Sequence, residues 1–276
     1  MTIKTLEFKG KANDLPGHID QLKKITKAVI WRGPSPADGK PIMAVISGMN
    51  GTSDNDKTGR MAQVDILRED LNPFEAIKLG LENSHTGDYS ICGNCSLRPH
   101  INPDTGKVER ICYVNILFGP NGKFKAVNRG SYQELTPAQA GLICRHYGVG
   151  IRHGAYADPA MVPVWVWAEL QQFAGTFHTS YTHQWLEPWF DPAIFQFAMA
   201  SIDKVNTVEK LRAKWPGARY YRMADNYDNL TPDEIKCPSN PDSRDENGQR
   251  NITCSQCKLC NGNTIKAKNI VIIENE

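Results

Sequence analysis

The spacing of hydrophobic and polar positions changes part-way along the chain. Within the first 135 residues, β-branched runs over residues 27–33 and 40–48 flank a turn rich in Pro, Asp and Gly, which predicts a β-hairpin. A third strand is predicted over residues 61–67. This part of the chain is therefore expected to be rich in β-structure.

Two further elements are predicted before residue 136. A helix is expected over residues 73–83, because Asn72 is a favourable N-cap and Pro73 suits the first helical position. The apolar runs over residues 112–118 and 123–128 surround a Gly-Pro-Asn-Gly sequence, which predicts another hairpin.

From Thr136 onward, segments typical of helices and of strands alternate. Thr136 and Gln139 have the spacing of a capping box, and the helix they begin is expected to reach Tyr147. Strands are predicted over residues 149–156, 176–182, 195–202, 218–223 and 270–273, and helices over residues 160–173 and 207–214.

This alternation is typical of βαβ units. We predict an α/β fold, in which a β-rich N-terminal part is followed by a parallel sheet or a partial (β/α) barrel. The expected division is into residues 1–135 and 136–276. Each part carries a Cys-rich insertion.

Hydropathy and the N-terminal residues indicate the compartment. No stretch approaches the ~18 apolar residues of a membrane span, so no membrane is expected. The first nine residues alternate charged and apolar side chains and lack the core of a signal peptide. We expect a cytoplasmic protein, where clustered cysteines bind metal more often than they form disulfides.

The clearest chemical signal is a group of four cysteines near the C-terminus. Cys254, Cys257 and Cys260 form a C-x2-C-x2-C sequence, and Cys237, followed by Pro, precedes them. Three thiolates at this spacing with a fourth from a Cys-Pro are typical of a 4Fe-4S cluster, although the Cys-Pro usually follows the triplet. Zinc is the alternative, because four thiolates also make a closed tetrahedral site.

A second group consists of Cys92, Cys95 and Cys112, which are predicted to form a site distinct from the first. Three thiolates need a fourth ligand, or else leave a position open for a substrate or cofactor. The candidates for a fourth ligand are His85, His100 and Cys144. An open position would permit S-adenosylmethionine to bind an iron–sulfur cluster, but the C-x3-C-x2-C spacing of radical enzymes is absent. A structural knuckle that orders its loop is the simpler interpretation.

Polar residues follow several of the predicted parallel strands, where α/β proteins gather ligands. They are Asp158, His183, Asp203 and Arg222. A His beside carboxylates and an Arg suits acid–base chemistry or anion binding, so these four are the predicted catalytic residues. The alternative is that they cap strands. Residues 48–59 form a polar loop that is long for a connection, and it is a candidate binding loop.

Several short motifs together resemble one family. They are Ile91-Cys-Gly-Asn-Cys95, Cys112-Tyr-Val-Asn115, Arg129-Gly-Ser-Tyr132, Gly154-Ala-Tyr-Ala-Asp-Pro159, Tyr181-Thr-His-Gln-Trp185 and the terminal Cys-Pro…C-x2-C-x2-C. The combination is similar to an uncharacterised Cys-rich family of tailed phages and mobile elements. This resemblance implies a bacterial host cytoplasm and a task in phage or plasmid propagation. The outline also resembles radical S-adenosylmethionine barrels.

Two functions fit these features. One is a metalloenzyme of the iron–sulfur class that acts on a nucleotide, a nucleic acid or a modified base. The other is a zinc-ordered protein without catalysis that binds nucleic acid or a host protein. The colour and metal content of the purified protein separate them.

Overall fold

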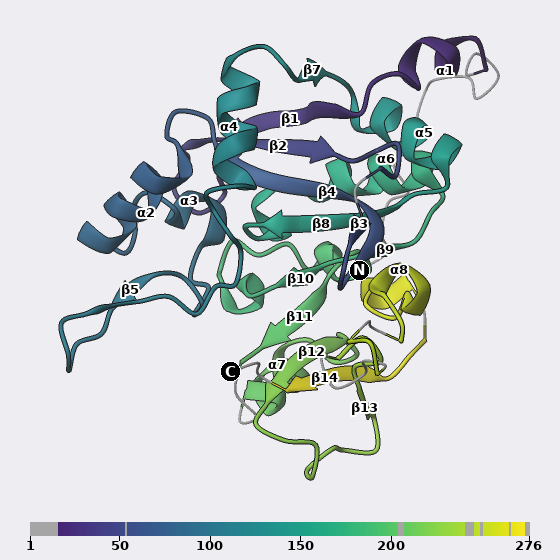
Figure 1. Ribbon diagram of the computed structural model, residues 1–276. Coiled ribbons are helices and arrows are strands. Elements are labelled where there is room, and N and C mark those ends of the chain that lie inside the picture. The colour runs from purple at the N-terminus through teal and green to yellow at the C-terminus, as the bar shows by residue number, and fades with distance from the viewer. Residues whose placement is uncertain are drawn as a thin grey trace.

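The computed structural model describes residues 16–52, 54–203, 207–240, 246–248, 251–264 and 266–273. The first nine residues, in which the sequence shows no signal-peptide core, lie outside these ranges. The described part is a mixed α/β structure built on two sheets (Figure 1).

The first sheet has the strand order β7-β1-β2-β4-β8-β9, and β3 pairs with β4 beside this path. Its strands are β1 (Lys27–Pro34), β2 (Pro41–Ser47), β3 (Asp54–Asn55), β4 (Gly59–Arg68), β7 (Gln133–Glu134), β8 (Gly150–Tyr156) and β9 (His178–Thr179). The β1–β2 and β2–β4 pairs are antiparallel, which confirms the predicted hairpin and third strand. The β4–β8 and β8–β9 pairs are parallel.

The second sheet is parallel throughout and has the order β10-β11-β12-β14-β13. Its strands are β10 (Tyr181–Thr182), β11 (Met199–Ile202), β12 (Tyr220–Ala224), β13 (Glu234–Lys236) and β14 (Asn269–Ile273). Because β9 and β10 follow each other within residues 178–182, one segment connects the two sheets. The predicted α/β class with a parallel second half is therefore confirmed. The pairing of β4 with β8 joins the two predicted regions in one sheet.

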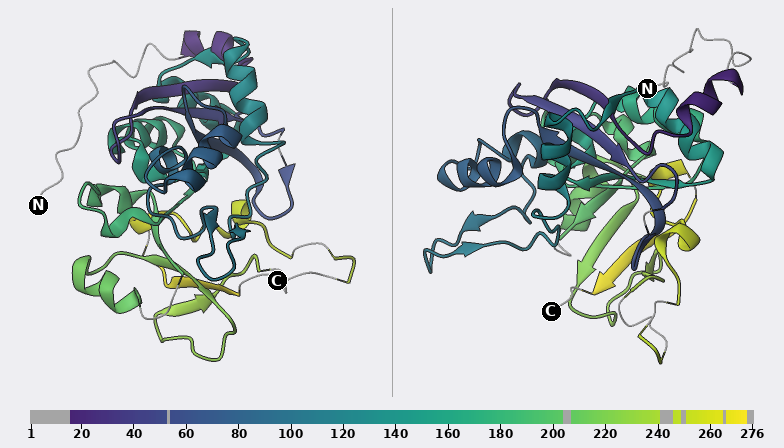
Figure 2. Two further views of the ribbon diagram at one scale, coloured as in Figure 1. Left: turned by 90° about the vertical axis from the view of Figure 1, so that its left-hand side faces the viewer. Right: turned by 45° about the horizontal axis from the view of Figure 1, so that its top comes forward.

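Most of the helices lie around the first sheet, whereas the helix over residues 207–214 contacts β11 of the second sheet, and a small hairpin extends from the molecule (Figures 1 and 2). The helices are α1 (Pro16–Leu22), α2 (Pro73–Glu82), α3 (Tyr89–Cys92), α4 (Pro120–Asn128), α5 (Pro137–Tyr147), α6 (Val164–Ala174), α7 (Thr207–Lys214) and α8 (Cys254–Cys257). The hairpin consists of β5 (His100–Ile101) and β6 (Val108–Glu109). Single 3₁₀ turns lie at Pro159–Met161, Gln184–Leu186, Pro192–Gln196 and Gly262–Thr264.

The two helix caps predicted from the sequence are present. The backbone N–H of Glu75 donates to the side chain of Asn72 over 3.0 Å, and the backbone N–H of Asn72 donates to the side chain of Glu75. Thr136 and Gln139 form the same reciprocal pair at the start of α5. Gly148 ends α5 in the left-handed conformation, which glycine adopts without steric cost. The local sequence therefore fixes where both helices begin.

One predicted hairpin is wrong. Residues 112–118 contain no strand, and residues 123–128 belong to helix α4. Pro120 occupies the first turn of this helix, and Lys123 reaches the buried Asp65 of β4 at 2.7 Å. A short run of alternating apolar and charged side chains fits either a strand or a helical turn, and packing against β4 selects the helix.

The predicted strand over residues 195–202 begins later than expected. Its first part is the 3₁₀ turn Pro192–Gln196, which the side chain of Asp191 caps through the backbone N–H of Ala193 at 2.9 Å. The strand β11 starts only at Met199.

Two histidines are buried in the core of the first sheet. The ring of His153, on β8, stacks against Trp167 at 4.7 Å and against His178 at 5.1 Å. Burial lowers the pKa of His178 to about 4, and it lowers the pKa of His153 well below its usual value. Both imidazoles are therefore neutral at neutral pH.

This burial predicts a loss of stability in mild acid. An unfolded His binds a proton below about pH 6.5, whereas folded His178 resists protonation down to about pH 4. The free energy of unfolding should therefore fall across this window, by about 3 kcal/mol for His178 alone. Denaturant titrations from pH 7 to pH 4.5 measure the slope. In the His178→Phe protein the slope should be shallower, and an unchanged slope would show that this residue does not contribute.

Candidate functional site

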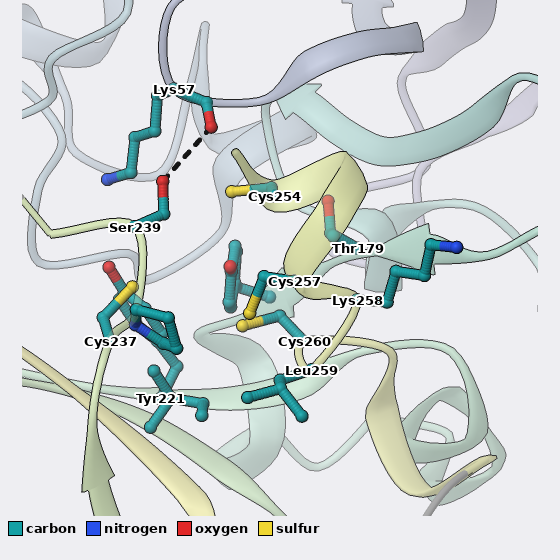
Figure 3. A pocket seen from close by; sticks show the side chains of 13 residues that line it. Lys57, Thr179, Tyr221, Cys237, Ser239, Cys254, Cys257, Lys258, Leu259 and Cys260 are labelled. Carbon is teal, nitrogen blue, oxygen red and sulfur yellow. Dashed lines mark hydrogen bonds between the residues drawn. The ribbon is translucent and has the colours of Figure 1, made fainter. Parts of the chain in front are cut away.

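The four C-terminal cysteines line one pocket, although Cys237 and Cys254 are separated by sixteen residues in the sequence. Cys254 and Cys257 lie on α8, Cys260 lies in the segment that follows it, and Cys237 follows β13 (Figure 3). The other residues that line the pocket are Lys57, Thr179, Tyr181, Tyr221, Pro238, Ser239, Lys258, Leu259 and Ile270. Residues of the second sheet therefore line this pocket together with the four cysteines.

Hydrogen bonds to the sulfur atoms accompany this arrangement. The backbone N–H of Ser239 donates to the thiol of Cys237, and the N–H of Leu259 donates to that of Cys257. The hydroxyl of Tyr181 bonds to the thiol of Cys260. Backbone N–H groups aimed at sulfur stabilise thiolate ligands and tune the potential of iron–sulfur clusters.

The polar loop over residues 48–59 holds this pocket in place. The backbone N–H of Cys254 donates to the carbonyl of Lys57 over 3.0 Å, and Ser255 donates to Thr58 over 2.9 Å. A side chain at Gly59 would collide with Ser255, since its Cβ would lie 2.4 Å from Oγ. The loop predicted to bind a ligand therefore supports the cysteine segment, and it brings the Lys57 side chain to the pocket.

The thiols are not in a position to share a single ion. Among the residues that the structure describes, no group of three or more His, Cys, Asp or Glu side chains is placed to hold one metal ion. Burial raises the pKa of Cys260 to about 12, so without a cation this thiol stays protonated. Metal binding at such a site releases protons and requires the side chains to adjust.

The N-terminal cysteines are gathered by a tight turn at the end of α3. The backbone N–H of Cys95 donates to the carbonyl of Cys92 over 3.2 Å, and Cys112 donates to Leu97 over 2.9 Å. Gly93 has a φ of 52°, and a Cβ there would lie 2.1 Å from the side-chain oxygen of Gln184. Only glycine fits this turn without moving its neighbours.

His183, Asp203 and Asp158 come together beside this turn, as the sequence predicts. Nε2 of His183 lies 3.3 Å from a carboxylate oxygen of Asp203, and the backbone N–H of His183 donates to Asp158 over 2.8 Å. A hydrogen bond also joins the side chains of His183 and Cys95. Burial by itself lowers the pKa of His183, but the interactions with Cys95 and Asp203 raise it well above its usual value.

Arg222 does not join this group, and its expected place on the same rim is corrected. Its guanidinium bonds both carboxylate oxygens of Glu234, at 2.8 and 2.9 Å, and both side chains are almost fully buried. Arg222 is in register with Ile202 on β11, so its side chain lies on the opposite face of the sheet from those of Tyr221 and Ser201. It holds β12 to β13.

The fourth-ligand candidates from the sequence lie elsewhere. Cys144 is completely buried in the core on α5. His100 is exposed on β5 with its ring 3.7 Å from Glu109, and the exposed His85 bonds Ser84. The interaction of His183 with Cys95 was not predictable from the spacing of motifs, because 87 residues lie between them in the chain.

A cluster that the sequence did not indicate lies between the two cysteine groups. Arg152 of β8 donates to the hydroxyl of Tyr113, which directly follows Cys112. Arg152 also interacts electrostatically with Tyr181 and Cys254. The rings of Tyr181 and Tyr221 are 4.6 Å apart. We call Tyr113, Arg152, Tyr181 and Tyr221 the tyrosine–arginine cluster.

Comparison with known proteins gives no match: no family model, no curated protein and no solved structure matches the chain. Within the described residues, no helix is long and apolar enough to cross a membrane.

Proposed function

We propose that the protein is an iron–sulfur protein in which Cys237, Cys254, Cys257 and Cys260 hold one 4Fe-4S cluster. The observation that carries this proposal is that all four thiols line one pocket. A cubane binds each thiolate through a different iron, and a Cys-Pro with C-x2-C-x2-C can supply four such thiolates. Lys57, which lines the pocket and interacts electrostatically with Cys237, would offset the negative charge of the thiolates.

The same proposal includes a ligand: a nucleotide, a nucleic acid or a modified base bound at the tyrosine–arginine cluster. Tyr113 is 73% exposed, so its ring is accessible for stacking on a base. Arg152 bonds its hydroxyl and supplies a cation for a phosphate. We place this activity in a bacterial cytoplasm and in phage or plasmid propagation, as the resemblance implies. S-adenosylmethionine could serve as a cofactor only if one iron of the cluster had no protein ligand.

A second function is favoured by one surface. Apolar side chains are unusually exposed between residues 101 and 118, and they are Ile101, Val108, Ile111, Tyr113, Leu117 and Phe118. Such side chains suit a protein partner. A zinc-ordered protein that binds a host protein would use this surface and would carry out no reaction.

Metal analysis of protein purified without oxygen separates the two. Iron and sulfide in equal amounts, with visible absorption, support the cluster. A colourless protein with stoichiometric zinc supports the alternative and contradicts the proposal.

The ligand is tested with a fluorescent single-stranded oligonucleotide at low salt. The Tyr113→Ala protein should bind it about 5- to 150-fold more weakly, which corresponds to the 1–3 kcal/mol of one base stacked on an aromatic ring. Phe118→Ala is the matched control, because Phe118 is 81% exposed in the same segment. Equal affinity of the Tyr113→Ala and wild-type proteins, or no binding by either, would refute this part of the proposal.

A further inference from the structure

We propose that the protein forms a symmetric dimer through the hairpin of β5 and β6, in which the free edge of β6 pairs with the same edge of a second copy of the chain. The contact uses the hairpin part of the exposed apolar surface described above. It needs neither a metal nor a reaction, so this proposal is independent of the cluster and of its ligand.

The hairpin presents an open edge at β6. Within the part of the chain that the structure describes, β5 and β6 form a two-stranded sheet of their own, and β5 is the strand that contacts helix α2. The hairpin extends from the body of the molecule, which leaves β6 accessible to another chain (Figures 1 and 2). A two-stranded hairpin is only marginally stable by itself in water, and an open strand edge is a template for pairing with a further strand.

The hydrogen bonds of the hairpin show which backbone groups face this edge. The N–H of Asn102 donates to the carbonyl of Lys107 over 2.9 Å, so these two residues form a hydrogen-bonded pair of the ladder. The next pair is Ile101 with Val108. Because hydrogen-bonded and non-hydrogen-bonded pairs alternate along an antiparallel ladder, Val108 directs its N–H and C=O away from β5. These two groups are available to a second strand.

The sequence of β6 is complementary to itself about Val108. In an antiparallel pair centred on Val108, the two copies of this residue lie opposite each other and exchange both backbone hydrogen bonds. Lys107 of each copy then lies opposite Glu109 of the other, so two pairs of opposite charges form across the two-fold axis. A pair centred on Arg110 would instead place two arginines opposite each other. Charge therefore selects the register at Val108.

The side chains of the hairpin suit the sheet that results. Ile101 and Val108 lie on one face and are 52% and 59% exposed. In the dimer, the two copies of this pair form one apolar stripe across four strands. The opposite face carries Glu109, which accepts from the side chain of Asn102 over 2.6 Å, and it also carries the Lys107–Glu109 pairs. An apolar face and a polar face are typical of an antiparallel sheet.

Sedimentation of the full-length protein at rising concentration tests this contact. The mass of the wild type should rise from that of one chain to that of two. Lys107→Glu and Glu109→Lys each place like charges opposite each other twice, so each should weaken the dimer about 10-fold or more. An equimolar mixture of these two variants should dimerise like the wild type, because two Glu of one chain then face two Lys of the other.

A backbone variant tests the hydrogen bonds separately. Val108→Pro removes an N–H that joins the two copies and that does not hold β6 to β5, so it should give a folded monomer. Val108→Thr keeps this N–H and is the matched control, which should still dimerise. Metal content should match the wild type in every variant, so failure of the C-terminal site is recognised separately.

The proposal is overturned if the wild type stays monomeric at the highest concentration. It is also overturned by a dimer that Val108→Pro and both charge variants leave unchanged, because another surface would then join the copies. Should Val108→Pro fail to fold, the mixture of Lys107→Glu and Glu109→Lys decides, and a mixture that stays monomeric removes the assigned register.

Discussion

The Cys257→Ser protein is expected to lose the whole C-terminal metal centre. Cys257 is the middle ligand of the C-x2-C-x2-C sequence, and its sulfur accepts the N–H of Leu259. Because such ligands gather only in the folded chain, the energy of metal binding is part of the folding energy, and its loss should lower stability by several kcal/mol. The change should be largest around α8 and the segment after β13.

Metal content and denaturant unfolding, measured on the same preparation, check this prediction. Cys144→Ala is the matched control, because Cys144 is a buried cysteine of the core that lines neither site. It should keep all of the metal. A Cys257→Ser protein with full metal content and an unchanged unfolding curve would rule out the C-terminal centre.

The second large effect is expected at the buried ion pair of Arg222 and Glu234. Glu234 also accepts from the hydroxyl of Tyr220 and the backbone N–H of Thr231, both over 2.9 Å. Replacing Glu234 by Leu leaves Arg222 buried without its partner, which typically costs about 3–5 kcal/mol of stability. The double variant Arg222→Met/Glu234→Leu should recover part of this loss, since no buried charge remains.

Equilibrium unfolding of the single and double variants measures the loss of stability and its partial recovery. The neighbouring pair of Arg212 and Asp233 is a good control, because both side chains are about half exposed and such pairs contribute about 1 kcal/mol or less. Metal content should not change in any of these proteins. A Glu234→Leu protein as stable as the wild type would show that the pair is not structural.

The sequence predicted those elements whose signals are local. The hairpin of β1 and β2 follows from two β-branched runs around a turn, and Asn72 and Thr136 mark helix starts through their own side chains. Helix α4 was missed because residues 123–128 are too few to show a period. The ionic contact between Lys123 and Asp65, which anchors this helix, joins distant segments.

The same contrast between local signals and contacts of distant segments applies to the candidate site. The cysteine spacing predicted two groups, because ligands two residues apart can face one centre. The contacts of His183 with Cys95, and of Arg222 with Glu234, depend on how strands from different parts of the chain are ordered. A strand-end position showed only that these side chains would lie near an edge of the sheet, and it did not reveal which partner each would meet.

We propose above that Cys237, Cys254, Cys257 and Cys260 bind one metal centre together. The most direct test is alkylation of each cysteine by a small thiol reagent, mapped by mass spectrometry before and after metal removal. We expect these four thiols to be protected together in the metal-loaded protein and to become reactive together when the metal is removed. Independent reaction of the four, at rates that metal removal does not change, would contradict it.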